Sequence, residues 1–560
     1  MCHIVCDIRH VKLPNNHACQ ETHCKFATLS QIKIQLNKKE TKEEEMAERK
    51  IAIIGAGISG LLACKHCLEK KDLDPVVFEA QSCIGGVWSK TIESTRLQTP
   101  RPFYQFSDFA WPPSVTATFP DHNQVLDYLH SYVSHFKILN KINFNTKVID
   151  ISYSCSESIC DFWGGSGEPF SSGKWNVTVQ DSRNPSAPIE VYQVDFVIVC
   201  IGSFSGLPNI PDFGIDRGPE VFGGVVMHSM DYAAMDYEAA AEFIKGKLVT
   251  VVGFQKSALD LAAQVAKSNG GEYPCTLLFR TVHWTVPDYF TAYTFKCLNR
   301  FVELMIHKPI EGFFQWFFAL LLSPLLWLYS KIVEHFLRFL YPLKKYNMVP
   351  NHGFIQQIFS CMSAITPPNF YDRVREGSLI LKKFNISFSF CKVGLIIDKE
   401  ESTPLVSDIV IFATGYKPDQ KLKNIFASLH FQKCIIGSSA PLYRECIHPS
   451  IPNLAILGYS DSPASLYSTE IKSKWVAEFL GGKFKLPSVK DMEEDVIRWE
   501  KCMKRYSGCS YKRYCSIALL QIYINDQLCK DIGCNPRRKN WFLADLFSTY
   551  GPTDYKNLTH

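Results

Sequence analysis

Three glycines early in the chain have the spacing of a dinucleotide-binding loop. Gly55-x-Gly57-x-x-Gly60 follows the apolar run IAII and opens the helical stretch ISGLLACKHCLEK. In such loops the first glycine permits a tight turn, the second lets a pyrophosphate approach the backbone, and the third allows close helix packing. Glu79 ends the next apolar run, where a carboxylate can accept hydrogen bonds from two ribose hydroxyls. The pattern predicts a βαβ unit for a dinucleotide without a 2′-phosphate.

A second loop of this kind lacks its middle glycine. In KLVTVVGFQKSALDLAAQVAK, Gly253 holds the turn position and Ala258 the third position, whereas Gln255 stands between them. The Cβ atom of Gln255 points to where a pyrophosphate would press on the backbone. The strand that follows ends in Arg280, and arginine suits the 2′-phosphate of NADP. The alternative, an arginine on a solvated strand end, stays open.

The residues after Gln255 offer replacement contacts to a phosphate. Lys256 supplies a cation and Ser257 a hydroxyl close to the expected position of the phosphates. We therefore expect a working NADPH site of reduced affinity, and not a site that has lost its function.

Composition limits the class of protein. With 560 residues, of which 46% are hydrophobic and 21% charged, the chain can form two or three packed domains. The net charge of +5 and the absence of a long basic run argue against a nucleic-acid partner. The 21 cysteines have no repeating spacing, and no metal site is predicted. Because no signal peptide is visible either, reduced thiols in a cytoplasmic compartment are expected.

The segment from Gly312 to Ser330 is apolar and uncharged. Gln315, Ser323 and Pro324 interrupt it, and charges resume at Lys331. These interruptions favour an apolar helical insertion packed on the nucleotide domains. A peripheral membrane contact and a membrane span are the alternatives.

These motifs together resemble the flavin-containing monooxygenases over residues 48 to 490. The resemblance is carried by the first glycine loop, GGVW at 85–88, ATGY at 413–416, and Phe222-x-Gly224-x-x-x-His228-x-x-x-Tyr232. Three further stretches are similar to the plant branch, near enzymes that N-hydroxylate pipecolic acid in immune signalling. These stretches are STRLQTPR (94–101), GFQKSALDLA, and LYRECIHPSIPNLAILGYSDS (442–462).

The resemblance implies an α/β fold with two Rossmann-like dinucleotide-binding domains, the NADPH domain inserted into the FAD domain. The FAD domain would comprise 46–208 and 413–490, and the NADPH domain 209–412, with the apolar helical insertion around 300–345. Residues 491–560 would form a helical extension. Residues 1–45, which end in a charged run, are expected to be a disordered extension.

The resemblance also implies the chemistry. NADPH reduces FAD, the flavin adds O2, and the C4a-hydroperoxide passes one oxygen atom to a soft nitrogen or sulfur nucleophile of a small molecule. His228 would join the domains without acting as an acid or base. Gln98 stands where many members carry an asparagine near the flavin, which makes it the catalytic candidate.

Cofactor contacts are implied in four parts of the chain. They are Gly55, Gly57, Ser59, Gly60 and Glu79; Gly86, Val87, Trp88, Gln98 and Thr99; Gly253, Ser257, Ala258, Arg280 and Thr281; and Thr414 and Gly415.

Three other functions compete with this assignment. A disulfide reductase needs a cysteine pair beside the flavin, and none follows GGVW. A Baeyer–Villiger monooxygenase would end the Phe/Gly/His motif in Trp, where Tyr232 stands here. A cofactor-binding regulator without turnover would explain why Gln255 replaces a loop glycine and why Gln98 replaces the asparagine of many family members.

The expected location is the cytoplasm, with peripheral association to the endoplasmic reticulum membrane as the alternative.

Overall fold

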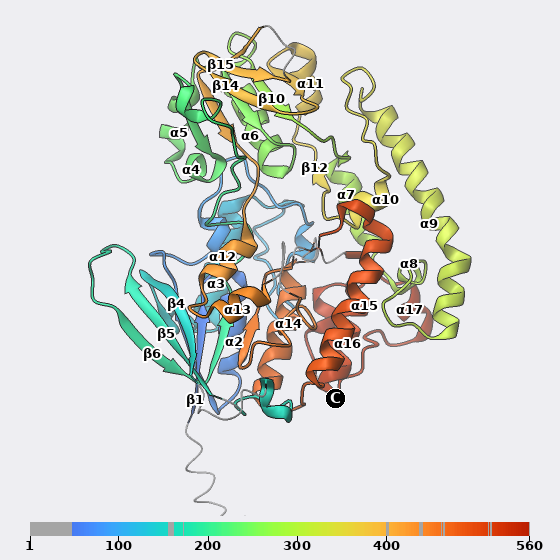
Figure 1. Cartoon of the computed structure of the whole chain (residues 1–560). Helices are drawn as coiled ribbons and strands as arrows, with labels where there is room; N and C mark the ends of the chain where they lie inside the picture. Colours follow the sequence, from blue (N-terminus) through green and yellow to red (C-terminus); the bar gives the residue numbers. More distant parts are fainter. Residues whose placement is uncertain are drawn as a thin grey trace, which may run out of the picture. The chain divides into compact units, whose positions relative to one another are not determined.

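The first of two parallel sheets is assembled from distant parts of the chain (Figure 1). In this computed structural model its strands run in the order β18-β7-β1-β2-β3, all parallel. They are β1 (Arg49–Ile54), β2 (Leu73–Phe78), β3 (Ile142–Asn143), β7 (Phe196–Val199) and β18 (Leu454–Ile456). Their apolar residues are mostly buried, as expected for a parallel sheet covered on both faces. Helices α2 (Ile58–Leu68) and α14 (Ser465–Leu480) pack side by side.

The second parallel sheet has the order β13-β10-β9-β17-β8. Its strands are β8 (Val225–His228), β9 (Val249–Val252), β10 (Cys275–Phe279), β13 (Leu379–Lys383) and β17 (Ile409–Phe412), and α6 (Lys256–Asn269) follows β9. All of these strands lie between residues 225 and 412, whereas the first sheet draws strands from both sides of that range. The predicted α/β fold, with one nucleotide domain inserted into the other, is confirmed.

Smaller elements complete the two domains. The antiparallel sheets are β4 (Thr146–Ser154), β5 (Lys174–Asp181) and β6 (Glu190–Val194), and β14 (Phe388–Cys391), β15 (Gly394–Ile397) and β16 (Leu405–Val406). The strands β11 (Thr285–Val286) and β12 (Ala364–Ile365) form a short parallel pair. The remaining helices here are α3 (His122–His135), α4 (Ser229–Ala233), α5 (Tyr237–Ile244), α11 (Phe370–Glu376), α12 (Pro418–Asn424) and α13 (Leu429–Cys434).

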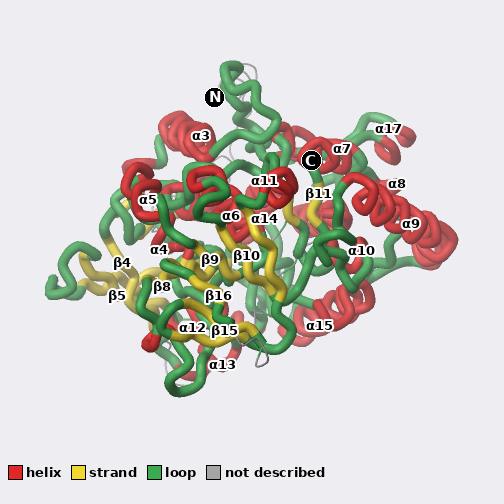
Figure 2. The backbone as a smooth tube through the Cα atoms, turned by 90° about the horizontal axis from the view of Figure 1, so that it is seen from above, coloured by secondary structure: helices red, strands yellow, loops and turns green. Residues whose placement is uncertain are grey.

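A group of helices lies to one side of the second sheet (Figure 2). It contains α7 (Asp288–Lys296), α8 (Arg300–Glu303), α9 (Phe313–Leu340), α10 (Phe354–Ile358), α15 (Val489–Ser507), α16 (Gln521–Ile532) and α17 (Phe542–Phe547). Arg300 joins the insertion to the C-terminal helices through two hydrogen bonds to Asp526, of 2.5 and 2.9 Å. A disulfide joins Cys361 to Cys515, which differs from the expectation that the thiols are all reduced.

The structure describes most of the chain after the N-terminal segment. The described residues are 48–154, 162–171, 173–398, 403–435, 441–460, 462, 465–512, 515 and 518–558. The extension expected at 1–45 lies outside them.

Two chain segments connect the nucleotide domains. The first leaves β7 and the second returns after β17, and they pair as an antiparallel bridge at Pro208 and Tyr416. Asn209 N donates to the Gly415 carbonyl at 2.9 Å, and Lys417 N donates to the Leu207 carbonyl at 2.9 Å. The two crossings therefore form one hydrogen-bonded connection.

Helix α9 differs from the expected packed insertion. One stripe is buried, from Ala319 through Leu326 and Val333 to Leu337. In the most apolar 18-residue stretch of α9, only 22% of the residues are buried. Among the described residues it is the one helix long and apolar enough to cross a membrane by length and composition. Apolar composition predicted the helix, but not that most of its side chains would lie outside the core.

Candidate functional site

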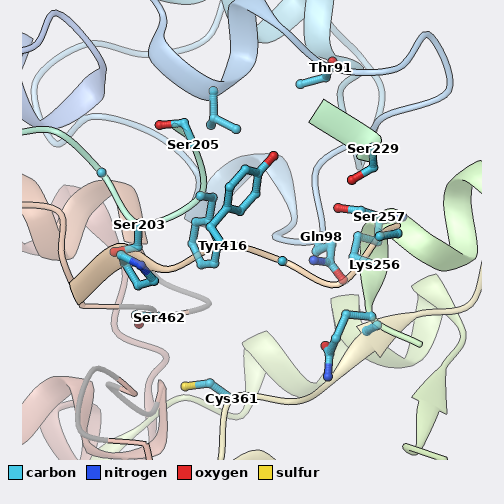
Figure 3. A pocket seen from close by; sticks show the side chains of 18 of the residues that line it. Thr91, Gln98, Ser203, Ser205, Ser229, Lys256, Ser257, Cys361, Tyr416 and Ser462 are labelled. Atoms are coloured by element: carbon cyan, nitrogen blue, oxygen red, sulfur yellow. The ribbon is translucent and has the colours of Figure 1, made fainter. Parts of the chain in front are cut away.

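A cavity of about 2550 Å³ lies between the two nucleotide domains. Both glycine loops, the returning segment at 413–416 and parts of α7 and α9 line it. Figure 3 shows Gln98, Lys256 and Ser257 to one side of Tyr416, and Ser203 and Ser462 to the other. The loops that line the cavity follow the carboxyl ends of parallel strands, which is where open α/β sheets bind ligands.

The first glycine loop excludes side chains at two of its three glycines for reasons within the protein. A Cβ on Gly60 would lie 1.8 Å from the Gly55 carbonyl oxygen, and one on Gly55 would lie 2.7 Å from that of Cys200. Gly57 is different, because a Cβ atom there would lie 3.6 Å from its nearest neighbour, the Gly86 Cα atom. This distance is an ordinary van der Waals contact. The missing side chain of Gly57 therefore keeps space open in the cavity, as a bound pyrophosphate requires.

Glu79 holds the first loop in place. Its Oε2 atom accepts a hydrogen bond from Ala56 N at 2.6 Å, and its Oε1 atom accepts one from Gln81 N at 2.8 Å. Each carboxylate oxygen can accept more than one hydrogen bond. Glu79 lines the cavity, so its second acceptor sites fit the two ribose hydroxyls of a dinucleotide.

The segment after the first βαβ unit contributes Gly86, Val87, Trp88 and Gln98 to the cavity wall. Trp88 Nε1 donates to the Tyr104 hydroxyl at 2.9 Å, which fixes the indole ring. Gln98 Oε1 accepts from Ile365 N of β12 at 3.1 Å. In the described part of the chain the Gln98 amide NH2 has no partner, so it is free to donate to a ligand.

The second glycine loop has an unstrained backbone at Gln255. This residue caps α6 with φ −99° and ψ −178°, close to the −74° and −179° of Gly57 at the start of α2. Any residue adopts this extended conformation. Gly253 has φ +141°, and a Cβ there would lie 2.4 Å from the Ala413 carbonyl oxygen, so its glycine is required. The loop is intact, and Gln255 affects only the space for a ligand.

Lys256 is not the free cation that the sequence suggested. Its Nζ atom lies 2.6 Å from Asp260 Oδ1, four residues along α6. Burial raises the pKa of Asp260 and the lysine opposes that shift, which makes the two a mutually dependent pair. Ser257 lines the cavity, as expected.

Arg280 and Thr281 follow β10 and line the cavity. Both are exposed, and the Arg280 guanidinium has no carboxylate partner among the described residues. Arg280 therefore occupies, at the second sheet, the position that Glu79 has at the first. Ala258 and Gly60 lie behind the loops, packed against the strands.

His228 holds the returning segment in place. Its Nδ1 atom accepts from Met230 N at 3.2 Å, so the proton is on Nε2, which donates to the Gly415 carbonyl at 3.0 Å. Burial lowers the pKa of His228, which favours this neutral form. Thr414 Oγ1 donates to the Asn209 carbonyl on the other crossing. A neutral, fully bonded histidine agrees with a structural role.

Two further residues of the cavity, Tyr416 and Lys421, were not among the predicted site residues. Tyr416 projects into the cavity (Figure 3), with its ring edge-to-face on His228 at 5.3 Å. Lys421 donates to the Ile201 carbonyl at 2.5 Å and to Ser205 Oγ at 3.0 Å, and burial lowers its pKa to about 8. The ATGY motif contains Tyr416 and is the sequence signal that could have identified it. No sequence signal in α12 indicates Lys421.

Known proteins share this organisation. A family model described as "Flavin-binding monooxygenase-like" matches residues 48–549. The "Probable flavin-containing monooxygenase 1" of Arabidopsis thaliana is 38% identical over 530 residues, covering 92% of this chain and 97% of the relative.

Two solved structures have the same fold. The S-allyl-L-cysteine S-oxygenase from Allium sativum has a TM-score of 0.54 at 18% identity, over 87% of this chain and 89% of its own. OTEMO in complex with FAD and NADP has a TM-score of 0.63 at 16% identity. The match covers 86% of this chain and 98% of that structure's chain. With the family match, the two glycine loops around one cavity identify the protein: it belongs to the flavin-binding monooxygenase-like family.

Proposed function

We propose that the protein uses FAD and NADPH to transfer one oxygen atom of O2 to a soft nitrogen or sulfur nucleophile of a small molecule. The observation that carries this proposal is the single cavity reached by both glycine loops. FAD would lie against Gly57 and Glu79, and NADPH against Gln255 and Arg280. Once reduced, the flavin supplies the oxygen-transfer chemistry.

The protein would position the two cofactors and keep water away from the reaction. Trp88 is fixed by Tyr104, and Gln98 presents an amide NH2 to the cavity. Phe290 and Phe295 of α7 and Phe354 of α10 line the cavity, and such apolar side chains would disfavour water beside a bound substrate. A substrate held there would present its nucleophile in the neutral form, with its lone pair available.

The finer proposal is N-hydroxylation of an amine or imino acid such as pipecolic acid. A secondary amine is a soft nucleophile, and the carboxylate of an imino acid would require a cation. The cavity wall includes basic residues, among them Lys421 and Lys512. The similarity of residues 94–101 and 442–462 to the plant N-hydroxylating branch supports this choice.

The proposed function is tested with purified protein under air. We expect flavin absorbance and NADPH oxidation, and a substrate should yield a product heavier by one oxygen while lowering the hydrogen peroxide released. Cyclic and aliphatic amines, pipecolic acid, thioethers and a cyclic ketone form the substrate panel. Flavin-loaded protein that NADPH cannot reduce at any concentration would instead be a regulator, and oxygen insertion only into the ketone would make it a Baeyer–Villiger enzyme.

Replacing Gln255 by glycine should tighten NADPH binding. The backbone of Gln255 is unstrained, so the change acts mainly through the space given to the pyrophosphate. Relief of one imperfect contact is worth about 1 to 2 kcal/mol, or roughly 5- to 30-fold in Kd. Stopped-flow flavin reduction across NADPH concentrations measures the effect. Gln255→Ala, which keeps the Cβ atom, should stay near the unmodified protein, and a glycine variant with no gain would show that Gln255 does not hinder the cofactor.

A further inference from the structure

The disulfide between Cys361 and Cys515 connects the two nucleotide domains. Cys361 lies between α10 and β12, and Phe354 of α10 is part of the buried core around β9 in the NADPH domain. Cys515 precedes α16, whose Leu528 is part of the buried core around β1 in the FAD domain. The bond is therefore covalent and joins one domain to the other.

Each end of the disulfide is attached closely to its own domain. Gln357 of α10 accepts a hydrogen bond from Trp284 N at 2.5 Å, which holds α10 against the NADPH domain. Trp475 of α14 donates to Asp531 of α16 at 3.2 Å, which holds α16 against the FAD domain. The second cysteine is separated from α16 only by residues 516–520. Because so short a segment spans little distance, the intact bond limits how far the domains can separate.

The other contacts at this place are noncovalent. The Phe359 ring stacks on Tyr506 of α15 at 4.3 Å, and Gln356 Nε2 donates to the Ser507 carbonyl at 3.2 Å. Contacts of this kind break and form again in local opening of a folded protein, whereas a disulfide does not break without a chemical reaction. The disulfide therefore decides whether an open state can be reached at all.

The disulfide lies away from the crossings between the domains. The crossings pair at 207–209 and 415–417, and α12 begins directly after the second one. Figure 1 and Figure 2 both show α10 and α15 next to each other and away from α12. When two domains hinge apart, the parts away from the hinge move furthest. A bond at this place consequently restrains opening more than a bond near the crossings would.

Cys361 is the accessible partner of the pair. It lines the cavity, where Figure 3 shows its side chain, whereas Cys515 is buried at 5% exposure. Cys361 also has φ +49°, in the left-handed region that favours glycine. A residue with a side chain stays in such a conformation only where its surroundings hold it, and such residues are frequent at switch regions. A small reductant in the cavity can thus reach the bond through Cys361.

We propose that Cys361 and Cys515 form a thiol–disulfide exchange site, which limits the opening of the cavity when oxidised and permits opening after reduction by a dithiol. One thiolate of the dithiol attacks Cys361 Sγ, which breaks the S–S bond and releases Cys515. The second thiolate of the dithiol attacks the first in the mixed disulfide and releases Cys361. Two electrons pass to the cysteine pair, the dithiol becomes a disulfide, and its two protons end on the cysteine sulfurs. The reverse exchange with a small-molecule disulfide restores the bond and yields two thiols.

The experiment compares the two redox states of the purified full chain loaded with FAD. Oxidised glutathione prepares the disulfide state and dithiothreitol the reduced state, and mass spectrometry of the digested protein measures the cross-linked peptide. The rise of flavin fluorescence after dilution gives the rate of FAD release, and small-angle X-ray scattering gives the radius of gyration. We expect reduction to make FAD release at least about fivefold faster and to increase the radius of gyration.

Two double variants separate this bond from the other thiols. Cys361→Ser/Cys515→Ser cannot form the bond, so it should release FAD at the faster rate with or without dithiothreitol. The matched control is Cys83→Ser/Cys509→Ser, which removes two exposed free thiols. It should respond to dithiothreitol as the unmodified protein does.

Three results would overturn the proposal. If oxidised glutathione yields no cross-linked peptide, the cysteines are not an exchange site. If reduction lowers the melting temperature but leaves FAD release and the radius of gyration unchanged, the disulfide only stabilises the fold. If Cys361→Ser/Cys515→Ser still responds to dithiothreitol, the effect belongs to other cysteines. Should that variant fail to fold, the two redox states of the unmodified chain and of the control decide between these outcomes.

Discussion

Replacing Gly57 by alanine should give a folded protein that purifies with little or no flavin. The new methyl group would meet only Gly86, at 3.6 Å from its Cα atom, so the fold has room for it. The same methyl group would stand where the pyrophosphate approaches the backbone. Overpacking of this kind costs about 1 to 3 kcal/mol, or roughly 5- to 150-fold in affinity. Flavin absorbance per polypeptide, with circular dichroism for the fold, measures the result.

Two other glycines serve as controls for this variant. Gly60→Ala places a Cβ 1.8 Å from a backbone oxygen, so it should disrupt the loop itself and lower stability as well as flavin content. At Gly271 a Cβ would have no neighbour closer than 4.0 Å, and Gly271→Ala should keep its flavin. Full flavin absorbance in Gly57→Ala would remove FAD from this loop.

Replacing Arg280 by alanine should abolish most of the preference for NADPH over NADH. The guanidinium lines the cavity at the end of β10 and has no carboxylate partner in the described chain, so its charge is available to a 2′-phosphate. Loss of one charge-assisted contact costs about 1.5 to 3 kcal/mol, or roughly 10- to 150-fold in the ratio of kcat/KM values. The ratio should fall because kcat/KM for NADPH drops while that for NADH changes little.

Two variants control for charge and for position. Arg280→Lys keeps the charge but loses the two-pronged geometry of the guanidinium, so it should retain an intermediate preference. Arg375→Ala removes an exposed arginine of the same domain, and its ratio should not change. If Arg280→Ala leaves the ratio unaltered, another residue recognises the phosphate.

The sequence predicted both nucleotide folds because their signals are local. A glycine loop, the apolar run before it and the charged residue after the next run all lie within one βαβ unit. Pairings within helices can also be anticipated, and Lys256 and Asp260 have the four-residue spacing of an ion pair on a helix. The ion pair with Asp260, and not a free cation for a phosphate, is therefore what the structure shows for Lys256.

Other features depend on tertiary packing and leave no local signal. Apolar composition is the same for a buried helix and an exposed one, so the outward face of α9 could not be predicted from its residues. Lys421 reaches the cavity only because α12 packs beside the end of β7, where Ile201 and Ser205 receive its hydrogen bonds. The hydrogen bond from Ile365 N of β12 to the Gln98 side chain likewise joins segments 267 residues apart.

The doubled crossing between the domains determines the kind of motion open to them. A single crossing would act as a swivel, since rotation about its backbone bonds could turn one domain in any direction. Two segments bonded side by side at Pro208 and Tyr416 form a ribbon, which resists twisting and flexes mainly about one axis. His228 adds a bond to Gly415 at one end of that ribbon. The ribbon therefore favours movement of the second domain along one arc, within the limits that the Cys361–Cys515 disulfide and the Arg300–Asp526 pair set on the opening of the cavity.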